Sequence, residues 1–304
     1  MTDYGHPLNF GAVLSPVAAE ASDLVALARL ADAEGLDLVG VLDHPYRPDF
    51  LDCFTLLAFI AGQTQHVSIF SDVACLPLRP PAVLAKVAAS LALLTGDRTI
   101  LGLGAGGMWA EIASFGGPMR SRGQAVQALS EAIEVIRALT RGQDNATPEK
   151  ISFQGTAYRI DGATAGPVPQ ARIPLWIGAY QPRMLRLTGE KGDGWIPSDM
   201  FLAPAGLPAS NQQIDDAALA AGRAPASIQR AYNISGKFGT GPDSGGFLQG
   251  PPQQWAEQLT ELAIGQGISA FILSPSGDAT RQLQIFACEV APAVAESVAK
   301  ARAA

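Results

Sequence analysis

The chain has 304 residues, an apolar share of 48% and a formal net charge of −7. A chain of this length buries a large core without metals or disulfides, and its acidic balance argues against nucleic acid and anionic membranes as partners, because both require clustered positive charge. Three cysteines without a CxxC pair, no visible signal peptide and no membrane-length apolar run predict a cytoplasmic protein, and three histidines without helical ligand spacing predict no metal site.

The first part of the chain alternates predicted strands and helices. A strand at Asn9–Leu14 precedes an amphipathic helix that Ser22 or Asp23 caps and that ends before Gly35. The segments that follow are strand 36–42, helix 54–61, strand 67–73, helix 81–94, strand 99–103 and helix 122–139.

The second part continues this alternation more weakly after Pro197. Strands alternating with helices specify a parallel sheet, and nearly eight such units in this length favour a closed (β/α)8 TIM barrel, class α/β, as a single domain over residues 1–304. The later strands are expected at 175–178, 194–196, Gln229–Ile234 and 269–273, and the later helices at 204–221, 252–265 and 278–299.

Residues 143–173 interrupt the alternation before the fifth strand. They are rich in Gly, Pro and Thr, and the segments 151–153 and 157–160 flank Gln154-Gly155-Thr156, which predicts a small hairpin. Long insertions in compact domains are usually functional or mobile. A structural cap and a substrate lid both remain open.

In barrels the active site is built from the loops that follow the strands. After the second strand stand Asp43, His44 and Tyr46, and an acid next to an imidazole suits proton transfer. The alternative is that Asp43 caps a turn and His44 lies at the surface. The third strand carries the polar pair Ser71-Asp72 inside an apolar run, an inconsistency of the kind that marks functional or strained sites.

The fourth strand runs into a glycine-rich loop. Gly106 and Gly107 let backbone approach a flat ring or a phosphate closely, although the spacing is not that of the Rossmann fingerprint. Trp109 and Glu111 follow. They suit either a substrate pocket or a packed helix with a solvated carboxylate.

The fifth strand runs into a predicted helix, whose N-terminal N–H groups attract anions. A phosphate would be received there, with Arg183 or Arg186 supplying charge. Trp195, at the sixth strand, is either a pocket wall or core. No GxSxG elbow and no Ser–His or Cys–His pairing stands out, so hydrolase chemistry is poorly supported.

Three stretches of this sequence together resemble the bacterial luciferase-like monooxygenase superfamily. They are VGVLDHPYRPDFLDCFTLLAFIAGQT, LGLGAGGMWAEIASFG and PLWIGAYQPRMLRLTGEKGDGWIPS, and the similarity extends over residues 8–273. The resemblance implies a barrel that holds FMN or the deazaflavin coenzyme F420 at the carboxyl ends of its strands. The Asp-His pair is similar to that of the deazaflavin-using branch, which makes F420 the first choice and FMN the second.

The resemblance also implies roles for individual residues. Asp43 and His44 would be catalytic, and a non-proline cis peptide is expected at Ser71–Asp72, behind the ring. The expected cofactor-binding residues are Ser71, Asp72, Gly106, Gly107, Gly178, Ala179, Tyr180 and Gln181. The expected pocket residues are Tyr46, Trp109, Glu111 and Trp195.

One departure from the family pattern concerns the loop after the fourth strand. Some deazaflavin sugar dehydrogenases have an acidic residue directly after this strand, whereas this chain has Gly107 there and Glu111 four residues later. This argues against a sugar-phosphate substrate. The aromatic pocket residues favour a hydrophobic or aromatic one.

Three functions are consistent with these residues. The first is F420-dependent hydride transfer to or from a small organic substrate. The second is an FMN-dependent monooxygenase that uses O₂ and a partner flavin reductase, and the third is a non-catalytic cofactor-binding protein, since fold alone does not fix function. The expected partners are a small-molecule substrate, a flavin or F420 reductase and a second copy of the chain, but neither nucleic acid nor a membrane.

Overall fold

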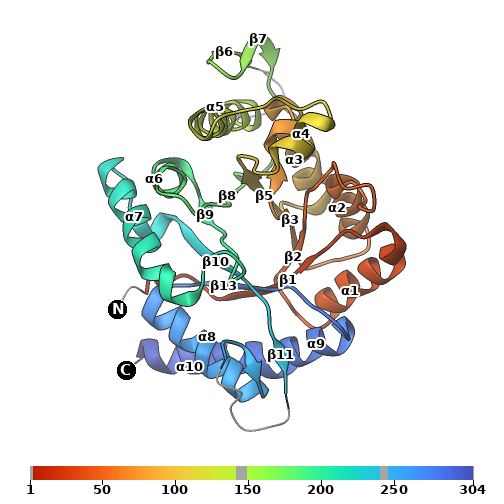
Figure 1. Ribbon diagram of the computed structural model, residues 1–304, viewed down its shortest axis with the longest axis vertical. Helices are drawn as coiled ribbons and strands as arrows, with labels where there is room; N and C mark the ends of the chain where they lie inside the picture. The colour runs from red at the N-terminus through yellow and green to blue at the C-terminus, as the bar shows by residue number, and fades with distance from the viewer. Residues whose placement is uncertain (1–2, 142–148, 240–245, 304) are drawn as a thin grey trace.

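A computed structural model describes residues 3–141, 149–239 and 246–303. Its centre is a closed ring of parallel strands with helices around it, as Figure 1 shows. The ring closes because β3 pairs with β5, which confirms the predicted barrel. The ring strands are β1 (Asn9–Leu14), β2 (Leu38–Val41), β3 (Ser68–Ser71), β5 (Thr99–Gly104), β8 (Leu175–Ile177), β9 (Gly194–Trp195), β10 (Gln229–Ile234) and β13 (Ala270–Leu273).

The helices follow the strands in the expected order. One prediction was wrong: helix α1 begins at Ala21 with Glu20 as its N-cap, so Ser22 and Asp23 lie inside the first turn. The reason is that a 3-10 turn at Ala18–Glu20 leads directly into the helix. The helices are α1 (Ala21–Ala33), α2 (Cys53–Ala61), α3 (Pro81–Thr95), α4 (Trp109–Ser114), α5 (Arg122–Thr140), α6 (Pro182–Lys191), α7 (Leu207–Ala220), α8 (Pro252–Gln266), α9 (Ala279–Ile285) and α10 (Ala291–Ala303).

The core has two layers. One lies between the strands and the surrounding helices, and the other fills the inside of the barrel. Inside, small residues face large ones: a side chain at Gly40 would meet the ring of Phe70, and one at Gly194 would meet Trp176. The inside of the barrel is therefore a packed core and not a pore.

The predicted third strand is interrupted before its end. After β3 the chain re-enters the sheet as β4 (Ala74–Cys75), which pairs with β5. The non-proline cis peptide bond lies between Asp72 and Val73, one bond later than the predicted Ser71–Asp72 bond. The Asp72 N–H still donates to the Val41 carbonyl at 2.8 Å, so the backbone leaves the ladder only after this residue.

The insertion before the fifth strand forms the expected hairpin, with β6 (Lys150–Gln154) and β7 (Arg159–Thr164) antiparallel. Residues 143–148 of the predicted insertion lie outside the described residues. Figure 1 shows the hairpin beyond α5, at the edge of the molecule. The buried Glu131 carboxylate on α5 accepts hydrogen bonds from the N–H groups of Thr156, Ala157 and Tyr158 at 2.8–3.0 Å. These contacts favour the structural cap over the lid.

Within the described part of the chain, no helix combines the length and the apolar character that crossing a membrane requires.

Candidate active site

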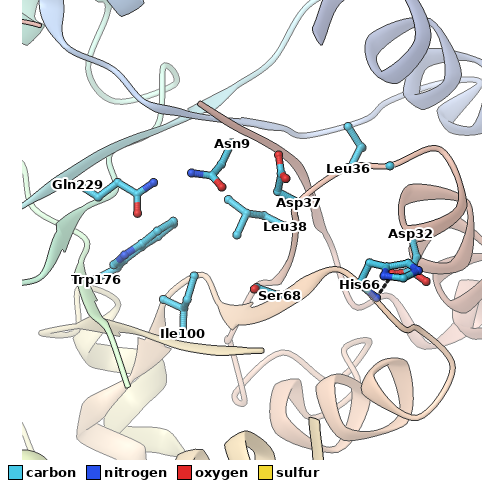
Figure 2. Close-up of a pocket in the computed structure, with 11 residues that line it drawn as sticks. Asn9, Asp32, Leu36, Asp37, Leu38, His66, Ser68, Ile100, Trp176 and Gln229 are labelled. Carbon is cyan, nitrogen blue, oxygen red and sulfur yellow. Dashed lines mark hydrogen bonds between the residues drawn. The ribbon is translucent and has the colours of Figure 1, made fainter. Parts of the chain in front are cut away.

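Described residues line a cavity at each of the two ends of the barrel. Figure 2 shows the cavity of about 330 Å³ at the amino ends of the strands, where Asn9, Ser68 and Gln229 lie. The other, of about 600 Å³, opens at the carboxyl ends and is called here the C-terminal cavity. Barrel enzymes place catalysis at the carboxyl ends, and this volume is ordinary for a small-molecule site. The C-terminal cavity is therefore the candidate site.

Most of the predicted site residues meet in this cavity. They come from the ends of β2, β3, β5 and β8, because closing the barrel brings the loops after these strands to one end. The predicted residues that line the cavity are Asp43, His44, Tyr46, Asp72, Gly106, Gly107, Gly178, Tyr180 and Gln181.

Three predicted residues lie beneath the wall. Ser71 is fully buried, and its hydroxyl donates to the Gly102 carbonyl at 2.9 Å. Trp195 is also fully buried, and its indole N–H donates to the carbonyl of the buried Ala179 at 2.9 Å. Trp195 is thus core rather than pocket wall, because its ring and its one polar atom are both occupied.

Two more predicted residues lie beside the cavity, on α4. The Trp109 ring packs close to the backbone of Gly106, where an added side chain would approach the ring to 3.0 Å. Glu111 is exposed in the first turn of the helix. Its charge contributes to the raised pKa of Tyr46, so it lies near the cavity mouth without lining it.

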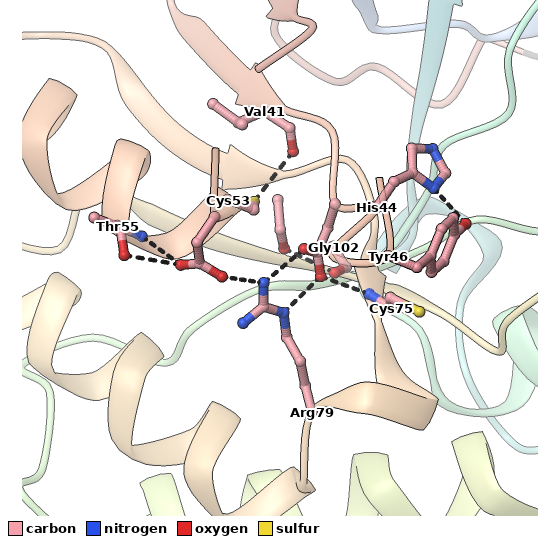
Figure 3. A network of polar contacts seen from close by, with 11 residues as sticks. Val41, His44, Tyr46, Cys53, Thr55, Cys75, Arg79 and Gly102 are labelled. Carbon is pink, nitrogen blue, oxygen red and sulfur yellow. Dashed lines mark hydrogen bonds and ion pairs between the residues drawn. The ribbon is translucent and has the colours of Figure 1, made fainter. Parts of the chain in front are cut away.

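Asp43 is held by an arginine that sequence reasoning missed. Arg79 donates to both Asp43 oxygens at 2.6 Å, and the Cys75 N–H donates to one of them at 2.8 Å. The same guanidinium also contacts Asp52, as Figure 3 shows for the network around Arg79. With its oxygens engaged in this way, Asp43 joins the end of β2 to the segment that follows β4.

His44 presents one ring nitrogen to the cavity. Its Nδ1 is 2.7 Å from the Tyr46 hydroxyl, and its ring packs against Phe50. Burial lowers the pKa of His44 despite the opposing charge of Asp43, so the imidazole is neutral at pH 7. Burial raises the pKa of Tyr46 to about 12, which keeps the phenol protonated. Nε2 has no hydrogen bond to the described residues and is the atom left for a ligand.

Asp72 lies on the cavity floor, where only 7% of the residue is exposed. Its Oδ2 accepts a hydrogen bond from Asn233 Nδ2 at 2.7 Å. Burial raises the pKa of Asp72 to about 7, against the lowering effect of that hydrogen bond. Sequence reasoning missed Asn233, because β10 also contains Gln229 and Arg230, so that one more polar side chain does not stand out there.

The remaining lining residues are mostly apolar. The Val73 side chain lies against Gly104 and Gly178. A Cβ atom added at these glycines would approach Val73 to 2.7 Å and 3.1 Å, respectively. Asp199 is tied to Ser235, whose N–H donates to it at 2.7 Å. Lining residues that were not predicted include Leu42, Val73, Met108, Met184, Ile196, Ser198, Asp199, Met200, Phe201, Asn233 and Ser235.

The described cavity wall carries acidic residues but no cation. No Lys or Arg lines it among the described residues, and the stretches 1–2, 142–148, 240–245 and 304 contain none in the sequence. The positive end of α6, reached through Gly178 and Gln181, is the feature of the wall that attracts an anion.

These residues fit a flat heteroaromatic cofactor. An added side chain at Gly107 would meet nothing within 4 Å, so this stretch of wall is open backbone. On the floor, Asn233 Oδ1 is buried and has no partner within the described ranges, which leaves an acceptor for a ligand N–H or O–H.

Comparison with the sequences of known proteins gives two findings. Residues 7–236 match the family model described as luciferase-like monooxygenase. An F420-dependent glucose-6-phosphate dehydrogenase from Nocardia farcinica is 30% identical over 228 residues, which are 73% of this chain and 66% of that protein. The chain thus spans slightly less than two thirds of this relative's length.

Among solved structures, an F420-dependent secondary alcohol dehydrogenase in complex with an F420-acetone adduct is similar with a TM-score of 0.83 at 21% identity, covering 95% of this chain and 99% of that one. The oxygenating constituent of 3,6-diketocamphane monooxygenase from Pseudomonas putida, in complex with FMN, has a TM-score of 0.75 at 16% identity, covering 94% and 99%. These two likenesses concern the fold.

Proposed function

This chain belongs to the luciferase-like monooxygenase family, and we propose that it is an oxidoreductase that uses coenzyme F420 to move a hydride to or from a small, uncharged organic substrate. The observation that carries the proposal is the position of His44. It lines the same cavity as the glycine-rich loop after β5 and Asp72, and its Nε2 has no hydrogen bond to the described residues. The naming of curated relatives as F420-dependent supports this cofactor, with FMN as the second option.

F420, when bound, supplies two-electron hydride chemistry. The protein's own contribution is orientation and proton transfer. His44 Nε2 takes a proton from a substrate hydroxyl, or returns one to a carbonyl, while the Tyr46 hydroxyl holds Nδ1. The Arg79–Asp43 ion pair fixes the backbone from which His44 projects, and the apolar wall excludes water.

The charge of the cavity points to an uncharged substrate. A phosphate group would face Asp72 and Asp199 with no Lys or Arg in the described wall to pair with it. An ion without a partner is costly to bury. The substrate class therefore differs from the sugar phosphate in the name of the Nocardia relative.

A second candidate is an FMN-dependent monooxygenase. The similarity in fold to an FMN complex and the apolar wall around Val73 favour it as the alternative. It would require O₂ and a partner flavin reductase. For either function, cytoplasmic localisation and assembly as a homodimer remain part of the proposal.

The test is a pair of titrations of the purified protein with F420 and with FMN, followed by fluorescence. We expect tight binding of F420 and, with a panel of uncharged alcohols and ketones, reduction or oxidation of the cofactor without oxygen consumption. Tight binding of FMN alone, with oxygen consumed during turnover, would replace the proposal with the monooxygenase. Cofactor binding without turnover on any panel would support a carrier, and absence of binding would refute cofactor use.

A further inference from the structure

The Asp72 carboxyl group is not needed by the chemistry proposed for His44. It lies on the floor of the C-terminal cavity, 7% exposed, at the point where β3 leaves the sheet. Burying a carboxyl group costs free energy unless hydrogen bonds or a nearby charge compensate for the water that it loses. Its contacts show what that compensation is.

The first contact is with Asn233 on β10, which lies on the opposite side of the barrel from β3. Asn233 Nδ2 donates to Asp72 Oδ2 at 2.7 Å, which leaves the second carboxyl oxygen without a hydrogen bond to the described residues. Asn233 Oδ1 is also without a partner there, and it is buried. Two groups already joined by one hydrogen bond thus hold two oxygens without a partner among the described residues, and the Asp72 oxygen becomes a donor when Asp72 is protonated.

The second consideration is charge. Within the described residues no cation compensates Asp72: Arg79 lies outside the cavity wall and is paired with Asp43 and Asp52, and no Lys or Arg lines the wall. Burial therefore raises the pKa of Asp72, and only the hydrogen bond from Asn233 opposes it. The titratable groups that face it are Cys53 from α2, Asp43 and His44 from the end of β2, Tyr180 from the loop after β8, and Asp199 from the loop after β9.

We propose that Asp72 is a neutral carboxylic acid in the working protein and that it forms, with Asn233, a donor and acceptor pair that binds the polar edge of the cofactor ring. The Asp72 O–H is the donor and Asn233 Oδ1 is the acceptor. Flavin and deazaflavin rings both carry carbonyl oxygens and an N–H, so the pair suits either ring. This inference rests on the proposed function only in that the ligand is such a ring.

One consequence is that cofactor binding weakens when Asp72 ionises. Loss of the proton removes the donor and places a carboxylate against ring carbonyls. If the acid form alone binds, and the pKa is about 7, the apparent affinity falls about tenfold between pH 6 and pH 8. Asn in place of Asp keeps a neutral donor at this position and cannot ionise.

The experiment measures the Kd of F420 and of FMN between pH 5.5 and 8.5 for the wild-type protein and for Asp72→Asn. We expect the wild-type affinity to fall across neutrality relative to the variant. Any ionisation of the ligand itself appears in both proteins, so the ratio of the two Kd values isolates Asp72. Asp37→Asn is the matched control, because Asp37 is also an acid with a raised pKa but lines the opposite cavity.

Each outcome has one meaning. A ratio that does not change with pH overturns the inference, whichever cofactor binds. If FMN binds and F420 does not, the proposed function fails while the pair is still tested with FMN, and binding of neither ligand refutes both. Should Asp72→Asn not fold, an NMR titration of ¹³C-labelled Asp carboxyl groups in the wild-type protein replaces it. One carboxyl must then titrate near neutrality and shift further upward in Asn233→Ala.

Discussion

Arg79 holds Asp43 through two hydrogen bonds, from Nε and Nη2, each 2.6 Å long. The Asp43 side chain is 1% exposed and that of Arg79 is 17% exposed, so the pair is largely withdrawn from water. Both oxygens of this acid accept hydrogen bonds, so we propose that Asp43, expected from the sequence to be catalytic, acts instead as a positioning residue that fixes the end of β2.

The first prediction concerns this ion pair. Arg79→Ala leaves the buried Asp43 charge without its partner, and breaking a buried pair on one side costs about 3–5 kcal/mol in the free energy of unfolding. Urea titration followed by circular dichroism measures it. The matched control is Arg47→Ala, because the Arg47–Asp49 pair is exposed to water and an exposed ion pair contributes little to the free energy of unfolding. Equal losses in the two variants would contradict the positioning role.

The second prediction concerns His44. Removal of a general acid or base usually lowers turnover by about 10²–10⁴-fold. We expect His44→Ala to lower kcat in this range while the Kd of the cofactor changes little. Tyr46→Phe should lower kcat less, because it removes only the hydrogen bond to Nδ1. His66→Ala is the control, since His66 is exposed at the other end of the barrel. Unchanged turnover in His44→Ala would exclude a catalytic role.

The barrel and most of the site residues could be predicted because they depend on local patterns. Apolar runs between glycines placed the strands, and closing a parallel barrel carries the ends of those strands to one place. His44, Asp72 and Gly107 therefore meet in the C-terminal cavity although no local pattern links them. The hairpin followed equally from its turn residues.

The partners of these residues could not be predicted, because they depend on register across the barrel. Asn233 is 161 residues from Asp72 in the chain, and Arg79 is 36 from Asp43. The position of Trp195 was undecided for a similar reason: β9 is short, and whether its ring faces the cavity or the core depends on how the strand lies beside β8.

The third prediction uses the stability of the protein without cofactor. The pKa of Asp72 is raised from 3.8 to about 7 in the folded protein, so between these values the folded state keeps a proton that the unfolded chain has lost. The stability due to Asp72 is complete below about pH 4 and is lost as the pH rises through 7. Asp72→Asn removes this dependence.

The free energy of unfolding of Asp72→Asn minus that of the wild type should therefore increase from pH 4 to pH 7 and then level off. The full change is on the order of 4 kcal/mol. Denaturant titrations at a series of pH values measure the difference. A flat difference would mean that Asp72 is ionised in the folded protein, and it would remove the basis of the pair with Asn233.

The fourth prediction tests whether the β6–β7 hairpin is a structural cap or a substrate lid. Glu131→Gln removes the charge that holds the N–H groups of Thr156, Ala157 and Tyr158, and hydrogen bonds to a charged group contribute about 1.5–3 kcal/mol each. Hydrogen exchange at these three amides should become markedly faster, while the Kd of the cofactor stays the same. The pKa of Glu131 is lowered to about 2, because hydrogen bonds from Gln127, Thr156 and Ala157 outweigh burial, so wild-type protection should persist well below pH 4. Weaker cofactor binding by the variant would instead indicate that the hairpin acts as a lid over the cavity.

The fifth prediction concerns the charge of the substrate. Because the described wall of the cavity has no cation, the wild-type kcat/KM for an uncharged alcohol should exceed that for its phosphorylated counterpart by more than tenfold. Met200→Lys places a cation at the cavity mouth, where the side chain is accessible, and should narrow this ratio by favouring the anion. Leu219→Lys is the matched control, since Leu219 is similarly exposed on α7 but does not line the cavity. If glucose 6-phosphate were turned over faster than uncharged alcohols, the carboxylates on the wall would not set the substrate class, and the anion would have to be held by the N-terminus of α6.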